Sequence, residues 1–220
     1  MEPTRPDVPF APVVRNALAL SHEYVRRVVR PGDFVIDATA GNGHDTLFLA
    51  GIVGPGGIVL AFDVQGEAVR KTKERVESAG MGDRCRILAE GHEHLAERVA
   101  EMDRASDVAA VMFNLGYLPG ADHAMGTRAD TTLPALVQAM SCLRPGGIVT
   151  VGIYYGGDSG FEERDAVLAF VEGIDVHGYA VQKTEMVNSR SCPPIFLCIE
   201  KLHPGKRKPR YVDVPDSFSG

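Results

Sequence analysis

The chain has few cysteines, no long apolar run and no excess of basic residues. Its four cysteines (Cys85, Cys142, Cys192 and Cys198) form no C-x-x-C pair and no metal-ligand spacing, so we expect reduced thiols and no metal site. No apolar run is long enough to span a membrane, and residues 1–12 are polar and rich in proline, unlike a signal peptide. These absences predict a cytoplasmic protein without a membrane anchor.

The charge balance also limits the partners that the sequence predicts. With a net charge of −6, the chain does not attract nucleic acid by bulk charge, so an RNA contact would need a local basic patch. A length of 220 residues suits one complete α/β domain and is short for two. We expect a flexible N-terminal arm at 1–12, one domain at 13–202 and a flexible tail at 203–220.

One stretch, residues 35–47, has the pattern of a buried strand, a sharp turn and the start of a helix. Val35 and Ile36 are β-branched and apolar, as a strand covered on both faces requires. Gly41 and Gly43 can adopt positive φ and let a ligand approach the backbone, while Asp45 or His44 can cap the helix. Such a turn places backbone N–H groups at the carboxyl edge of a sheet, where open α/β folds bind ligands.

Two ligand classes fit this turn, beside the simpler interpretation of an ordinary strand-to-helix connection. The dinucleotide fingerprint G-x-G-x-x-G is incomplete, because Thr46 stands where its last glycine belongs. The spacing of Asp37, Thr39, Gly41 and Gly43 resembles instead the first motif of class I S-adenosylmethionine-dependent methyltransferases, with Thr39 replacing the first glycine. A carboxylate at Asp37 suits the ammonium group of a methionine tail and does not suit a pyrophosphate.

Apolar runs and helical periodicities alternate along the chain. Strands are expected at 33–38, 58–62, 85–89, 108–113 and 148–155, and helices at 13–29, 45–53, 66–79, 93–102 and 161–172. A further helix, capped by Asp130 or Thr131, should end at the Arg-Pro-Gly-Gly stretch 144–147. Two closing strands at 175–187 and 195–201 predict a Rossmann-like class I methyltransferase fold, with a seven-stranded mostly parallel sheet, an antiparallel last strand and helices on both faces.

Polar residues follow the second and third expected strands. Asp63 lies twenty positions after Gly43, where a nucleoside-binding fold places the carboxylate that holds ribose hydroxyls, and Gln65 could reach the adenosine. His92 follows the third strand, where it would neighbour the adenine. The alternatives are a helix cap at Asp63 and a surface or capping histidine at His92.

The chemistry is expected after the fourth strand, in residues 114–120. Amino-directed methyltransferases carry a [D/N]-P-P-[Y/F] pattern at this turn, and Asn114 and Tyr117 occupy its outer positions while Leu115 and Gly116 replace the prolines. The partial match favours nitrogen as the methyl acceptor, although Tyr117 could instead be a buried core aromatic. In the polar loop that follows, Asp122 and His123 could receive a proton or hold the substrate.

Taken together, these motifs resemble one family closely. The stretches 37–46, 62–65, 113–123 and 131–132, with the closing 193–201, are similar to the small bacterial class I methyltransferases of the YtqB type, long labelled rRNA methylases. Members are assigned as tRNA 5-aminomethyl-2-thiouridine methyltransferases (MnmM-like). The chain departs from this pattern after the fifth strand, where Gly156-Gly157-Asp158 stands in place of a histidine.

The resemblance implies N-methylation of the aminomethyl group on the wobble uridine of tRNA. The cofactor would be S-adenosylmethionine, with S-adenosylhomocysteine as its product, and the partner would be the tRNA anticodon stem-loop; a homodimer stays open. The implied catalytic residues are Asn114, Tyr117, Asp122 and His123. The implied cofactor residues are Asp37, Thr39, Gly41, Asn42, Gly43, Asp45, Thr46, Asp63, Gln65, His92 and Asn114. The alternatives are methylation of rRNA or a small-molecule amine, and a non-catalytic subunit that binds cofactor and RNA.

Overall fold

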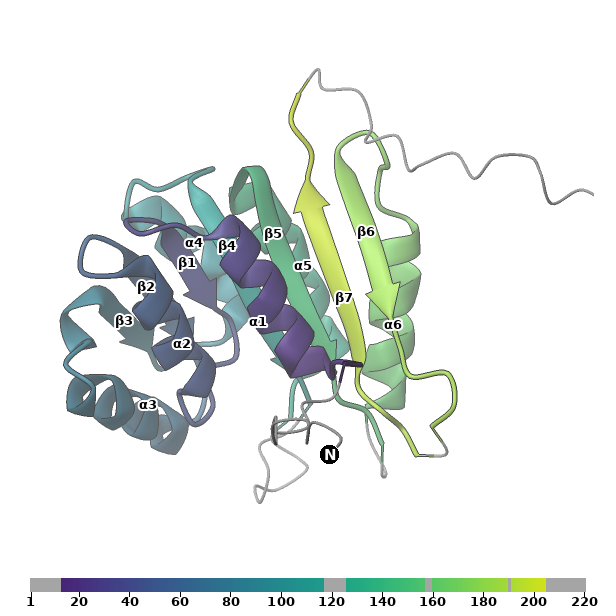
Figure 1. Cartoon of the computed structure of the whole chain (residues 1–220), viewed down its shortest axis with the longest axis horizontal. Coiled ribbons are helices and arrows are strands. Elements are labelled where there is room, and N and C mark those ends of the chain that lie inside the picture. The colour runs from purple at the N-terminus through teal and green to yellow at the C-terminus, as the bar shows by residue number, and fades with distance from the viewer. Residues whose placement is uncertain (1–12, 117–125, 157–159, 190, 205–220) are drawn as a thin grey trace, which may run out of the picture.

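The computed structural model describes residues 13–116, 126–156, 160–189 and 191–204 (Figure 1). The predicted arm at 1–12 and all of the predicted tail except residues 203 and 204 therefore lie outside the described residues. Within the described part of the chain, no helix combines the length and the apolar character needed to cross a membrane.

A single seven-stranded sheet forms the centre of the molecule, in the order β3-β2-β1-β4-β5-β7-β6 (Figure 1). Its strands are β1 (Phe34–Asp37), β2 (Ile58–Phe62), β3 (Cys85–Leu88), β4 (Val108–Leu115), β5 (Leu143–Ile153), β6 (Tyr179–Thr184) and β7 (Ile195–Lys201). The first five strands pair in parallel, whereas β7 runs antiparallel to both of its neighbours, β5 and β6. The predicted topology, including the antiparallel last strand, is confirmed.

Helices cover both faces of this sheet (Figure 1). On one face lie α1 (Ala17–Val28) and α2 (His44–Val53), with α3 (Gly66–Ser78) beside α2. On the other face lie α4 (Leu95–Glu101), α5 (Ala129–Cys142) and α6 (Phe161–Glu172). Two short 3₁₀ turns, Gly82–Arg84 and His92–His94, precede β3 and α4.

The central strands β1 and β4 are mostly apolar, and their polar residues stand near the carboxyl end, because both faces of each strand pack against helices. In β1, Phe34 and Ile36 belong to the core under α4–α6, whereas Val35 belongs to the core under α1 and α2. All three side chains are almost completely buried. Each burial contributes about 1.5–3 kcal/mol to stability, so this alternation fixes the register of the strand.

The boundary between α5 and β5 differs from the prediction. The helix begins at Ala129 after the N-cap Arg128, so the expected caps Asp130 and Thr131 are wrong. It ends at Cys142, and β5 starts at Leu143 because Leu143 pairs with Val108. The next pair joins Ala110 to Ile148, so residues 144–147 bulge out of the strand and do not terminate the helix.

Candidate functional site

Two glycines in the connection from β1 to α2, Gly41 and Gly43, have positive φ angles, in the left-handed region of backbone conformation. The φ angles are 53° at Gly41 and 78° at Gly43. Gly43 is the N-cap of α2 without a side-chain cap bond, so the expectation that His44 or Asp45 caps this helix is wrong. A Cβ atom added to Gly43 would lie 2.8 Å from Thr72 Cα on α3. The turn thus packs directly on α3, which only glycine allows.

Asp37 lies beneath this turn and is completely buried. Its Oδ2 accepts a hydrogen bond from Thr46 Oγ1 at 2.6 Å, and its Oδ1 accepts one from Thr39 N at 3.2 Å. Burial, and secondly the negative charge of Asp45, raise the pKa of Asp37 to about 7. The structure therefore places Asp37 as a support of the turn, with both carboxyl oxygens bonded to residues of the turn and the first turn of α2.

Asp63 connects the end of β2 to the same turn. Its Oδ2 accepts from Gly41 N at 2.8 Å, and its Oδ1 accepts from Gln65 N at 2.9 Å. The carboxylate is partly exposed, and each of its oxygens has a second lone pair. Asp63 can therefore accept two further hydrogen bonds from vicinal hydroxyl groups at the sheet edge.

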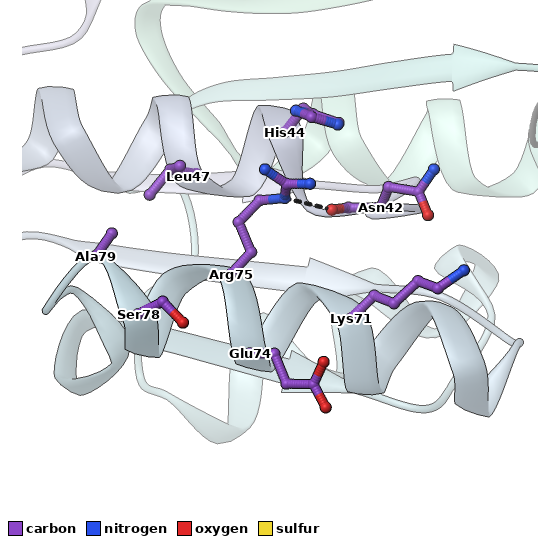
Figure 2. A pocket seen from close by; sticks show the side chains of 8 residues that line it. All are labelled: Asn42, His44, Leu47, Lys71, Glu74, Arg75, Ser78 and Ala79. Carbon is purple, nitrogen blue, oxygen red and sulfur yellow. Dashed lines mark hydrogen bonds between the residues drawn. The ribbon is translucent and has the colours of Figure 1, made fainter.

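Asn42, between the two glycines, borders an open hollow between α2 and α3 (Figure 2). Arg75 Nε donates to the Asn42 carbonyl oxygen at 2.7 Å, and Thr72 Oγ1 donates to the Gly41 carbonyl oxygen at 3.1 Å. Besides Asn42 and Arg75, the residues that line the hollow are His44, Leu47, Lys71, Glu74, Ser78 and Ala79. Thr72 and Arg75 on α3 thus stabilise the glycine turn through hydrogen bonds to its carbonyl oxygens. Neither residue was predicted as part of the site.

His92 is buried beside the turn, with 7% of its surface exposed. Its Nδ1 lies 3.1 Å from the Ala38 carbonyl oxygen, and because a carbonyl only accepts, Nδ1 carries the proton. Nε2 is then a bare acceptor, and it is buried without a hydrogen-bond partner among the described residues. Burial lowers the pKa of His92, which keeps the ring neutral.

Asn114, near the end of β4, is bonded to both neighbouring segments. Its backbone N–H donates to Thr39 Oγ1 at 2.8 Å, and its Nδ2 donates to Asp45 Oδ2 at 2.7 Å. The other oxygen of Asp45 lies 2.6 Å from Nε2 of His22 on α1. Burial, and secondly the charge of Asp45, raise the pKa of the nearby Tyr154. His22 was not predicted as part of the site, because it stands 23 positions from Asp45 and 92 from Asn114 and no local pattern connects them.

Thr127 connects the end of β4 to α6 by hydrogen bonds. Thr127 Oγ1 accepts from Gly116 N at 2.8 Å and donates to Glu163 Oε2 at 2.7 Å, while Glu163 Oε1 accepts from Thr132 Oγ1 at 2.6 Å. Glu163 is buried and sits at the first turn of α6. This buried carboxylate was also not predicted as part of the site.

The remaining predicted catalytic residues, Tyr117, Asp122 and His123, lie outside the described residues. The predicted cofactor residues and Asn114 lie together at one edge of the sheet, because β1, β2 and β4 are parallel and end side by side. This edge carries hydrogen-bond acceptors suited to a nucleoside and an amide suited to an amine. Such an arrangement can bind and orient two reactants, which is the main requirement of a group-transfer enzyme.

Comparisons with known proteins agree with this description. The family model described as "Putative rRNA methylase" matches residues 59–200. A protein of Arabidopsis thaliana, named chloroplastic tRNA (mnm5s2U34)-methyltransferase, is 35% identical over 195 residues, which cover 85% of this chain and 70% of the relative.

Two solved structures are similar along most of the chain. A Clostridium thermocellum protein with the same rRNA-methylase description is 46% identical, with a TM-score of 0.83 over 86% of this chain and 100% of its own. A Streptococcus mutans protein, described as a methyltransferase and solved in complex with SAH, is 34% identical, with a TM-score of 0.77 over 86% of this chain and 100% of its own. The chain therefore belongs to the rRNA methylase family of class I S-adenosylmethionine-dependent methyltransferases.

Proposed function

We propose that this enzyme transfers a methyl group from S-adenosylmethionine to the aminomethyl nitrogen of a wobble 5-aminomethyl-2-thiouridine in tRNA. The observation that carries the proposal is the fixed amide of Asn114, held beside the glycine turn by Asp45. The curated relative from Arabidopsis supports the same substrate, because its name states that reaction and the similarity covers 85% of this chain.

The residues around the turn fit the cofactor. The bare, buried Nε2 of His92 is an acceptor without a described partner, and the exocyclic amine of an adenine is a donor that would satisfy it. The remaining lone pairs of Asp63 suit the two ribose hydroxyls. Gly41 and Gly43 let the methionine part approach the backbone, and Asp37 acts through the turn that it supports. When bound, S-adenosylmethionine supplies an electrophilic methyl group.

Asn114 has the central role in the proposed mechanism. Because Nδ2 is bonded to Asp45, the carbonyl oxygen Oδ1 remains to accept an N–H of the substrate amine and aim the nitrogen lone pair. The amine reacts in its neutral form, which a positively charged neighbour and partial removal of water both favour. We further propose that Tyr117 stacks on the uracil and that Asp122 and His123 hold the substrate or accept its proton.

The test uses the purified chain, labelled S-adenosylmethionine and tRNA from cells that lack this gene, followed by mass spectrometry of the nucleosides. A methyl group on 5-aminomethyl-2-thiouridine is the expected result. Asn114→Ala should keep its affinity for S-adenosylmethionine and lose most of its turnover, because the orienting acceptor is gone. Unchanged turnover in Asn114→Ala would remove this residue from the mechanism.

The family description favours rRNA as a second candidate substrate. Ribosomal RNA from the same cells, offered in competition with the tRNA, distinguishes the two. Methyl transfer by the purified chain alone would also exclude a role as a non-catalytic subunit. The cytoplasmic location, the anticodon stem-loop as the contacted part of tRNA and a homodimer remain predictions.

A further inference from the structure

Three side chains from three separate elements form one hydrogen-bonded chain beside the proposed active site. His22 on α1 contacts Asp45 on α2 through Nε2 and Oδ1 at 2.6 Å. Asp45 Oδ2 accepts from Asn114 Nδ2 on β4 at 2.7 Å. Asp45 is 7% exposed, so its charge is nearly removed from water and both of its oxygens are bonded to side chains.

The chemistry of Asp45 determines how the other two side chains are oriented. An ionised carboxylate only accepts hydrogen bonds, so Asn114 must turn its NH₂ group toward Asp45. The amide oxygen of Asn114 then faces Gly152 on β5, where an added Cβ atom would lie only 3.2 Å from Oδ1. By the same rule, His22 must present a protonated Nε2 to Asp45. Reversing the Asn114 amide would place a donor where an acceptor for the amine is needed.

His22 is itself held firmly in place. Its ring stacks on Phe48 of α2, with ring centroids 3.7 Å apart and planes within 7° of parallel. The helix itself is anchored on the sheet by buried apolar residues such as Ala17 and Val25, and by a hydrogen bond from Tyr24 Oη to Gln182 Oε1 on β6 at 3.0 Å. Because stacking on Phe48 already orients the ring, His22 loses little further conformational freedom when it bonds to Asp45. A residue that positions another side chain needs such a fixed orientation.

We propose that His22 is a positioning residue for methyl transfer, which acts through Asp45 to hold the Asn114 amide oxygen toward the acceptor amine. This inference rests on the proposed function, since it gives Asn114 the same role. It assigns α1 a role in the methyl transfer through His22, although no residue of this helix was expected to take part. A tether that merely attaches α1 to the sheet would stabilise the fold and leave the chemical step unchanged.

The experiment compares His22→Ala, His22→Gln and Glu23→Ala with the wild type, under single-turnover conditions with tRNA carrying 5-aminomethyl-2-thiouridine. His22→Ala should lower the rate constant about 10- to 100-fold, because a modest misplacement of a reacting group has effects of this size. The dissociation constant for S-adenosylmethionine should stay within about twofold, since no cofactor contact is removed. Glutamine can offer an N–H in the place of Nε2, so His22→Gln should recover part of the rate. Glu23, the next residue on the same helix, pairs only with Arg27 among the described residues, so Glu23→Ala should behave as the wild type.

A double variant tests whether His22 acts through Asn114. Residues that work as one unit have non-additive effects, so His22→Ala combined with Asn114→Ala should be no slower than Asn114→Ala alone. Multiplied losses in the double variant would overturn the inference, and so would an unchanged rate in His22→Ala. A loss of cofactor affinity at constant rate would also overturn it, by assigning the pair to cofactor binding. If His22→Ala does not fold, His22→Gln decides: its rate should lie between those of the wild type and Asn114→Ala, and a folded His22→Gln as slow as Asn114→Ala contradicts the role. A wild-type protein that binds S-adenosylmethionine but does not methylate this tRNA would instead refute the proposed function.

Discussion

Replacing Asp37 with asparagine removes a carboxyl group that is completely buried under the glycine turn. The pKa of Asp37 is raised from its ordinary value of 3.8 to about 7, first by burial and then by the charge of Asp45. Between these two pH values the folded protein holds a proton that the unfolded chain has released. Stability is therefore highest below pH 3.8 as far as this group is concerned, and it falls as the pH rises to about 7.

The size of this effect follows from the two pKa values. The difference between 3.8 and about 7 corresponds to about 4 kcal/mol, at about 1.36 kcal/mol for each pH unit. Since the unfolded group is already mostly ionised at pH 5, about 3 kcal/mol of this loss should fall between pH 5 and pH 8. Asparagine does not ionise and keeps an oxygen that can accept from Thr46, so Asp37→Asn should lack this pH dependence.

The assay is urea unfolding of the wild type, Asp37→Asn and Asp83→Asn at pH 5, 6, 7 and 8. The free energy of unfolding of the wild type, relative to Asp37→Asn, should decrease by about 3 kcal/mol over this range. Asp83 is exposed and serves as the control, so its variant should follow the wild type. Parallel pH profiles for the wild type and Asp37→Asn would refute the reasoning, because Asp37 would then already be ionised at pH 5 in the folded protein.

Three glycines give further predictions. Gly152→Ala should lower the rate of methyl transfer about tenfold without loss of cofactor affinity, since its Cβ would lie 3.2 Å from Asn114 Oδ1 and displace it; equal rates in a stopped-flow assay would contradict this. Gly43→Ala should cost about 1–3 kcal/mol of stability and weaken S-adenosylmethionine binding in calorimetry, because φ is 78° and the Cβ would meet Thr72 Cα. Gly51→Ala, within α2 and with no atom within 4 Å of its Cβ, should instead stabilise the protein by about 1 kcal/mol in thermal unfolding. A destabilised Gly51→Ala would show that the turn of α2 at this position tolerates no side chain.

Local patterns predict the fold well where apolar runs end at strong turn signals. The strands Ile58–Phe62 and Ile195–Lys201 and the helix Phe161–Glu172 have the expected bounds. In each case the periodic run starts or stops at glycine, proline, aspartate or histidine. Such boundaries depend on the backbone preferences of a few neighbouring residues, so sequence reasoning can find them.

The boundary at Leu143 could not be found in this way. Leu143 joins β5 because it pairs with Val108, 35 residues earlier, and no local signal describes that contact. Arg144 bonds to both carboxylate oxygens of Asp33 at 2.7 and 2.9 Å, which holds the bulge after Leu143 against the start of β1. A long-range pairing thus overrides the turn preference of the Pro-Gly-Gly sequence.

In the candidate site, too, some features follow from the sequence and others depend on long-range contacts. Parallel topology alone places Asp37, Asp63 and Asn114 at one edge, as predicted from the order of strands. The order of strands does not reveal how deeply each side chain is buried: Asp37, the last residue of β1, is buried, whereas Asp63, which directly follows β2, is partly exposed. The contact of His22 with Asp45 depends on how α1 crosses the sheet, which is a property of the assembled core.

The position of β7 between β5 and β6 has a consequence for synthesis on the ribosome. β6 pairs only with β7 within the described sheet, yet β6 is made first and must wait for residues 195–201. Until those residues leave the ribosomal tunnel, the long strand β5 has an open edge that other chains could join. The nascent protein therefore completes its sheet only after β7 has been made and has left the tunnel. A chain that ends before residue 195 would lack β7, and the open edge of its β5 would favour aggregation.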